Sequence, residues 1–146
     1  METKPKLYIP RTTHSKIMHW VNSSNLEVGG MGMVHYNKDE NYFWIGDGYL
    51  LDQEVGAATT DIDAEAVGKL EMQVMGQPGN LNWWWHSHVN MSVFWSGTDR
   101  ETITKYGRNG FMLATVFNKR NEMRSAICYR ATTDFGNAVV FVDELE

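Results

Sequence analysis

The stretch from Leu81 to Trp85 limits the possible folds more than any other segment, because it is apolar at every position except Asn82. A strand that is apolar on both faces belongs at the centre of a sheet rather than at its solvent-exposed margin. Side chains alternate along a strand, so we expect Trp84 to face one side and Trp83 and Trp85 to face the other. The segment therefore predicts a sheet with a buried central strand and three tryptophans in the core.

The rest of the chain predicts helices and strands around that segment. The glycines at positions 29, 30 and 32 indicate either a bulge with a close backbone approach or a twisted edge, and both readings stay open. Thr98 followed by Glu101 predicts a capping box at the start of a helix. The predicted fold class is α+β, with α/β/α-like layering and a mixed, mainly antiparallel sheet flanked by helices. Helices are expected at 13–22, 62–75 and 98–107, and strands at 28–36, 42–51, 81–85, 111–117, 123–129 and 139–142, with the first two strands forming an antiparallel hairpin.

The chain is long enough for one domain. Its 146 residues show no internal repeat and no Pro/Ser-rich linker, so we expect a single domain over 1–146 with a core at about 10–142. The acidic residues 143–146 are expected to form a solvated tail.

Composition excludes several classes of protein. The net charge of −5 argues against a nucleic-acid partner. Cys128 is the only cysteine, which excludes an intramolecular disulfide and a Cys-rich metal site; its apolar neighbours predict a buried strand residue rather than a nucleophile. No segment has the length and composition of a signal peptide or a membrane span, so no membrane contact is expected and the expected location is the cytoplasm.

His86-Ser87-His88 is the motif most indicative of chemistry. Alternate strand residues share a face, so both imidazoles can reach one ion. Asp99, eleven residues further on, lies in the first turn of a predicted helix. Two imidazoles and one carboxylate leave a tetrahedral position open, as in catalytic zinc sites. The alternatives are two histidines without a metal, and a Ser96-x-x-Asp99 pair that serves only to cap the helix.

Taken together, these residues resemble a known family. His-x-His, seven residues, Ser96, two residues and Asp99, preceded by Glu27 at the head of a glycine-rich strand, match the JAMM motif of the MPN (JAB) zinc metalloproteases in type and spacing. The resemblance covers roughly residues 10–142 and is closer to prokaryotic and phage-type members. It implies the cytidine-deaminase-like MPN/JAB fold. Val89 departs from the family, which commonly has proline there, and we expect a looser loop as a result.

The resemblance also implies a role for each residue. His86, His88 and Asp99 would hold one Zn²⁺ per chain, with water in the fourth position. Glu27 would act as general base, and the hydroxyl of Ser96 would donate a hydrogen bond to the oxyanion.

The implied partner is a protein or peptide, with the tail of a ubiquitin-like protein as one option. Such tails bind as added strands, which predicts a substrate groove at Gly29 and Gly30 and after His88, with Trp95 as a wall. The expected activity is zinc-dependent amide hydrolysis, in the manner of a peptidase, isopeptidase or deubiquitinase-like enzyme. The alternatives are a non-catalytic MPN scaffold and a zinc hydrolase acting on nucleic acid. Substrate identity and oligomeric state stay open.

Overall fold

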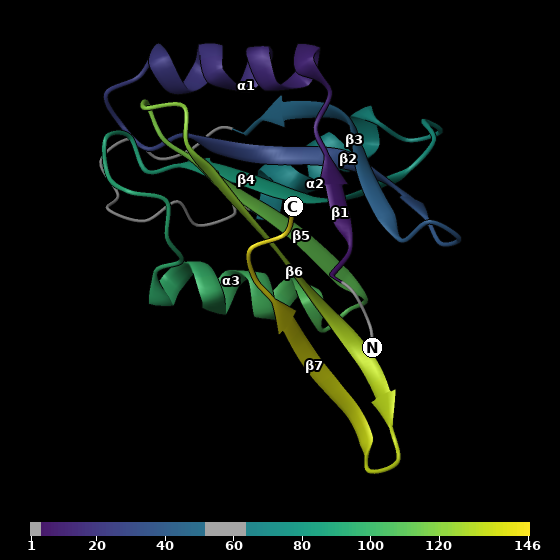
Figure 1. Ribbon diagram of the computed structural model, residues 1–146. Coiled ribbons are helices and arrows are strands. Elements are labelled where there is room, and N and C mark those ends of the chain that lie inside the picture. The colour runs from purple at the N-terminus through teal and green to yellow at the C-terminus, as the bar shows by residue number, and fades with distance from the viewer. Residues whose placement is uncertain (1–3, 52–63) are drawn as a thin grey trace.

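Figure 1 shows the computed structural model, in which a curled sheet lies between helices. The structure describes residues 4–51 and 64–146. Within this part of the chain the sheet has seven strands in the order β1-β3-β2-β4-β5-β6-β7. The strands are β1 (Lys6–Tyr8), β2 (Gly29–Asn37), β3 (Tyr42–Leu50), β4 (Asn80–Ser87), β5 (Phe111–Phe117), β6 (Met123–Thr133) and β7 (Gly136–Val142), and the helices are α1 (Arg11–Asn22), α2 (Ala64–Gln73) and α3 (Gly97–Gly107).

Strand pairing confirms the predicted mixed, mainly antiparallel sheet. Only β1 with β3 and β4 with β5 run parallel among the described pairs. The other four pairs, β2 with β3, β2 with β4, β5 with β6 and β6 with β7, are antiparallel. Two parallel strands need a crossover connection, and α3 supplies it between β4 and β5. The class α+β is therefore confirmed.

The three consecutive tryptophans of β4 lie where the alternating pattern predicts. Trp83 and Trp85 pack in the core beneath α1, with Ile17 and Val21 of that helix. Trp84 packs on the other face with residues of α2 and α3. Each indole is almost fully buried, and burial of large aromatic surface on both faces makes β4 the central support of the sheet.

The glycine-rich strand β2 is interior, since it pairs with β3 on one side and with β4 on the other. A bulge falls between Gly32 and Val34, and a Cβ at Gly30 would overlap the carbonyl oxygen of Tyr49. That carbonyl accepts a hydrogen bond from Nε1 of Trp85 at 3.2 Å. The bulge with close backbone approach is therefore confirmed, and the twisted-edge reading is wrong.

The helices agree with their predicted ranges, with small shifts at the ends. α1 begins at Arg11, two residues before the prediction, directly after Pro10. Leu70 and Val74 are buried on the apolar side predicted for the second helix, whose expected start at 62–63 lies outside the described residues. No helix in the described ranges is long and apolar enough to cross a membrane.

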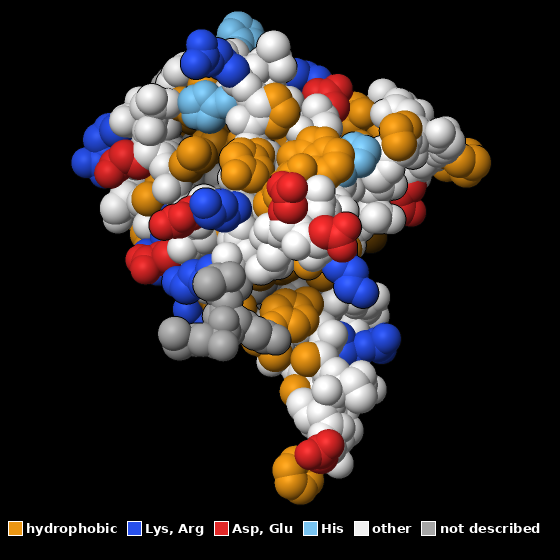
Figure 2. Space-filling view, turned by 45° about the vertical axis from the view of Figure 1, so that its right-hand side comes forward, with side chains coloured by type: hydrophobic (Ala, Val, Ile, Leu, Met, Phe, Trp, Pro, Cys, Tyr) orange, Lys and Arg blue, Asp and Glu red, His pale blue; other side chains and the backbone are white. Residues whose placement is uncertain are grey.

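The last two strands are longer than predicted and form a ribbon that projects from the body (Figure 1). Polar Thr132, Thr133 and Asn137 hid this extension, because they interrupt the apolar pattern. Phe135 is fully exposed at the turn, where Figure 2 shows a hydrophobic side chain at the tip. Cys128 is fully buried in β6, and burial raises the pKa of its thiol, which disfavours the reactive thiolate.

The predicted solvated tail is correct only for Glu144 and Glu146, which are exposed; Asp143 and Leu145 are partly buried and hold the chain end against the domain. Asp143 accepts hydrogen bonds from Nη2 of Arg124 at 2.6 Å and from Nε1 of Trp95 at 2.8 Å. The backbone N–H of Leu145 donates to the carbonyl of Ser125 at 3.0 Å. The high charge of this segment predicted exposure to solvent. Hydrogen bonds from an arginine and an indole N–H to the Asp143 carboxylate instead attach the segment to the rest of the domain.

The Asp143 carboxylate makes the stability of the fold depend on pH. Burial raises its pKa, but the hydrogen bonds from Arg124 and Trp95 outweigh burial and lower the pKa below the ordinary aspartate value. A lowered folded-state pKa gives stability that is full above the unfolded value of about 3.9 and is lost as pH falls through the folded value. Urea unfolding of metal-free protein should therefore show Asp143→Asn less stable than wild type at pH 7, with the gap closing below about pH 4. Asp39→Asn, in an exposed turn, is the control; an equal gap at both pH values would contradict the assignment.

Candidate metal centre

The end of β4 and the start of α3 bring three predicted ligands together. His86 lies in β4, His88 lies just beyond it, and Asp99 lies in the first turn of α3. Oδ2 of Asp99 is 3.2 Å from Nε2 of His86 and 3.3 Å from Nε2 of His88. One ligand atom from each residue lies within 4.8 Å of the others, and all three residues are buried. The group could therefore bind a metal ion.

His86 is the most deeply buried of the three candidate ligands. Its ring is fully buried and stacks on Trp84 at a centroid distance of 4.4 Å. Neither ring nitrogen has a hydrogen-bond partner among the described residues, since the contact with Asp99 is close but not aligned for one. Burial lowers the pKa of His86, so the ring is neutral and keeps a lone pair. A buried imidazole with free lone-pair capacity fits a metal ligand, because a metal ion would satisfy it.

His88 is oriented by a backbone contact. Its Nδ1 lies 3.1 Å from the carbonyl oxygen of Ser92. A carbonyl can only accept, so Nδ1 carries a hydrogen, and Nε2, which faces the carboxylate of Asp99 at 3.3 Å, is the nitrogen left to bind a metal ion once it is deprotonated. Burial lowers the pKa of His88, but hydrogen bonding to Asp99 and Ser92 outweighs it and the pKa is raised. Such a backbone acceptor behind a histidine is typical of metal ligands.

Asp99 both caps α3 and faces the histidines. Its backbone N–H donates to Oγ of Ser96 at 3.0 Å, and the N–H of Ser96 donates to Oδ2 of Asp99 at 3.0 Å. Burial alone would raise the pKa of Asp99, but contact with His86 and His88 holds that pKa well below its usual range. The carboxylate is therefore charged and available as a ligand. The cap is Ser96 with Asp99, and the Thr98–Glu101 capping box predicted from the sequence is wrong.

Ser96 lies at the same helix start, beside the carboxylate of Asp99. Its cap uses an oxygen lone pair, because Oγ accepts from the N–H of Asp99. The O–H hydrogen can still be donated to another acceptor. Capping and hydrogen-bond donation are thus compatible in one side chain.

Glu27 comes to the site through the pairing of β2 with β4. Gly29 pairs with His86, and the N–H of Ser87 donates to the carbonyl of Val28 at 2.8 Å. Continuing this antiparallel register by one more residue places Glu27 opposite His88, on the same face. Burial raises the pKa of Glu27, with a further rise from Asp99 and an opposing effect of His88, so the carboxyl is electrostatically coupled to the ligand group.

Val89 has a left-handed backbone, with φ of 60°. That conformation is rare for a β-branched residue, and proline cannot adopt it because its ring fixes φ near −65°. The N–H of Val89 donates to Oγ of Ser87 at 3.0 Å, and its carbonyl accepts from the N–H of Lys119 at 2.6 Å. The loop after His88 is therefore tied by hydrogen bonds to Ser87 and to Lys119, and the effect of valine on its mobility stays a prediction.

The predicted substrate groove included the backbone at Gly29 and Gly30 and the side chain of Trp95, and the structure places only Trp95 beside the candidate metal centre. Gly29 and Gly30 are buried in a strand with neighbours on both sides, so they offer no free edge for an added strand and that prediction is wrong. Trp95 lies next to the site, with its ring centroid 6.1 Å from that of His86. The carboxylate of Asp143 fixes its indole. No sequence signal marked Asp143, which is distant in the chain, or the Ser92 carbonyl, which any residue type could supply.

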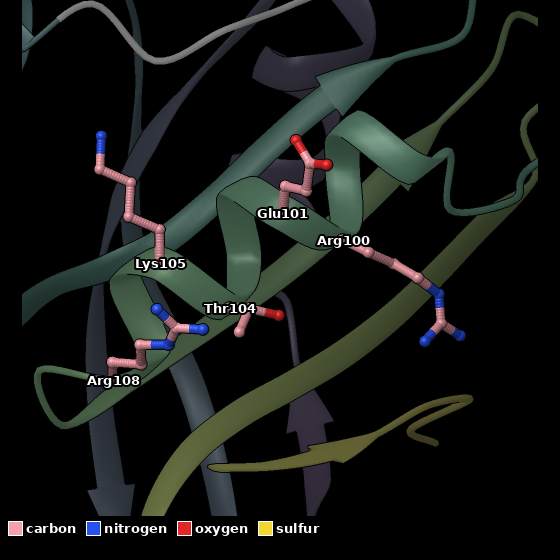
Figure 3. Close-up of a pocket in the computed structure, with 5 residues that line it drawn as sticks. All are labelled: Arg100, Glu101, Thr104, Lys105 and Arg108. Atoms are coloured by element: carbon pink, nitrogen blue, oxygen red, sulfur yellow. The ribbon is translucent and has the colours of Figure 1, made fainter.

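A separate hollow lies on the exposed side of α3 and is shown in Figure 3. Arg100, Glu101, Thr104, Lys105 and Arg108 line it, and none of the metal-ligand candidates does. Arg100 and Lys105 point in opposite directions rather than toward one point (Figure 3). This hollow is therefore distinct from the metal centre and does not gather its charges around a single ligand.

Comparison with known proteins gave no family model that matches the sequence and no matching curated protein. The chemistry of the residues themselves therefore carries the functional inference.

Proposed function

We propose that the chain is a zinc-dependent peptidase or isopeptidase of the JAMM (MPN/JAB) type that hydrolyses an amide bond. The main support is the convergence of His86, His88 and Asp99 around a buried imidazole that has no hydrogen-bond partner among the described residues. Glu27, coupled to this group, supplies a carboxyl group of raised pKa. A ligand set with a nearby base and an open position is the minimum that zinc-assisted hydrolysis requires.

The spacing of the ligand atoms supports zinc over a hard cation. Two ligands at about 2.05 Å from a tetrahedral ion lie about 3.3 Å apart. The carboxylate oxygen of Asp99 lies 3.2 and 3.3 Å from the two histidine nitrogens. Mg²⁺ and Ca²⁺ prefer oxygen ligands, whereas imidazole nitrogen suits zinc.

The residues then divide the chemistry between them. Zinc bound by this group would lower the pKa of a coordinated water and polarise the amide carbonyl. Glu27 would accept a proton and return it to the departing amine nitrogen, which is the work of a general base followed by a general acid. The hydroxyl of Ser96 would donate to the carbonyl oxygen as negative charge develops on it. The hydrogen bond from His88 Nδ1 to Ser92 would keep the imidazole in one orientation throughout.

Metal removal tests this proposal. Protein purified without added metal should contain about one zinc per chain, measured by inductively coupled plasma mass spectrometry. Chelation should abolish cleavage of a library of quenched-fluorescent peptides, and added Zn²⁺ but not Mg²⁺ should restore it. Less than about a tenth of an equivalent, with no uptake of added zinc, would instead favour the non-catalytic scaffold. Full zinc occupancy with no cleavage of any peptide or isopeptide would exclude the hydrolase.

A further inference from the structure

Large apolar side chains are exposed on the segments that carry the candidate site. Leu26 directly precedes Glu27 and is 47% exposed. Met91, whose N–H donates to the carbonyl of His88, is 51% exposed. Phe94 is 39% exposed, and its ring meets the ring of His88 edge-on at a centroid distance of 4.6 Å. We call Leu26, Met91 and Phe94 the apolar rim.

The apolar rim lies at one end of the sheet. The pairing of Gly29 with His86 sets the segment before β2 beside the segment after β4. The turn between β5 and β6 joins both segments, because the N–H of Lys119 donates to Val89 and its Nζ donates to Oδ1 of Asn25 at 3.3 Å. Members of the rim thus come from separate parts of the chain that are fixed together around the site.

Trp95 gives this end of the sheet a rigid aromatic wall. Its indole N–H donates to Oδ1 of Asp143, and Nε of Arg124 donates to the same oxygen at 3.1 Å. The neighbouring Phe94 contacts His88, while Trp95 lies against His86. Two consecutive aromatic residues therefore lie beside the two histidine ligands.

The rim favours an apolar ligand over a charged one. Two nearby arginines are paired with carboxylates, Arg120 with Glu122 and Arg124 with Asp143, and the ammonium of Lys119 donates to Asn25. Exposed apolar side chains beside a group of candidate metal ligands are typical of a surface that binds apolar side chains. From this juxtaposition, and resting on the proposed function, we infer that the substrate is a peptide with a bulky apolar side chain next to the scissile amide. A tail that ends in glycines alone offers the rim no side chain to bury.

Binding of matched peptides tests the inference without turnover. Zinc-loaded Glu27→Gln protein is titrated with short fluorescein-labelled Ser/Gly peptides that differ at one position, which is Leu, Gly or Asp. Burial of a leucine side chain should make the Leu peptide bind at least about tenfold more tightly than the Gly peptide, by fluorescence anisotropy. Affinities within about twofold of each other would overturn the inference.

A pair of matched variants locates the effect. In the same background, Phe94→Ser should remove most of the preference for Leu while zinc content stays unchanged. Phe135→Ser, which changes the exposed phenylalanine of the β6–β7 ribbon, should leave the preference intact. A loss of preference in both variants, or in neither, would overturn the assignment to the rim.

Hydrolysis by wild-type protein separates this inference from the proposed function. Cleavage of Leu and Gly peptides with equal kcat/KM would overturn the substrate preference and leave the hydrolase intact. Tighter binding of the Leu peptide with no cleavage of any peptide would overturn the hydrolase and leave an apolar-peptide site.

Discussion

Glu27→Gln should lower the rate of amide hydrolysis by at least about a hundredfold while the protein still binds zinc, because a general base commonly contributes about 10²- to 10⁴-fold. Glutamine has nearly the same shape but cannot accept the proton. Glu27 is not one of the three grouped ligands, so metal content should not change. Single-turnover kinetics on a cleaved peptide, together with elemental analysis of zinc, measure both quantities.

Glu101→Gln is a matched control, since Glu101 is an exposed carboxylate on α3 beyond the ligand group. It should keep the wild-type rate. Unchanged turnover in Glu27→Gln would remove Glu27 from the reaction, whereas loss of zinc from that variant would make it a ligand instead.

His86→Leu should abolish metal binding without destabilising the metal-free fold. The ring of His86 is fully buried and its nitrogens have no hydrogen-bond partner within residues 4–51 and 64–146, and an unsatisfied buried polar group costs about 1–3 kcal/mol. Leucine has similar bulk and no polar atom, so the free energy of unfolding of metal-free protein should be equal to wild type or up to about 1 kcal/mol higher. Wild type should gain about 2.7 kcal/mol at free zinc about 100 times Kd, and the variant should gain nothing.

Urea unfolding with and without zinc measures these differences. His19→Leu, at an exposed position of α1, is the control and should keep the zinc-dependent gain. A metal-free His86→Leu protein much less stable than metal-free wild type would mean that the imidazole supports the fold itself rather than a ligand site.

Sequence patterns predicted the fold best where side chains are buried. Alternation in Trp83-Trp84-Trp85 predicted the central strand and the face of each indole, because only a strand covered on both sides can bury all three. The β6–β7 ribbon and β1 were missed or cut short. The residues that were missed, 6–8, 130–133 and 136–138, are mostly exposed, so no apolar pattern distinguishes them from loop. Tertiary pairing rather than composition decides such strands.

The candidate site shows the same division between local and long-range information. The spacing of His86, His88 and Asp99 indicated a possible metal site, and the family resemblance selected it over two histidines without a metal and a purely capping aspartate. The position of Glu27 near His88 depends on the pairing of β2 with β4, which no local pattern predicts, and the sequence pointed to Glu27 only through the family resemblance. The Ser92 carbonyl, the left-handed backbone of Val89 and the Asp143 contact to Trp95 leave no mark in residue type or spacing.

The single carboxylate oxygen shared by the capping box and the histidines links two equilibria. Oδ2 of Asp99 accepts the N–H of Ser96 and also faces both imidazoles. A metal ion bound there would draw electron density from the same oxygen that accepts the capping hydrogen bond at the start of α3. Ion affinity and fraying of this turn are therefore not independent properties. The hydrogen-exchange rate of the Ser96 amide should therefore change with the fraction of protein that has an ion bound at Asp99.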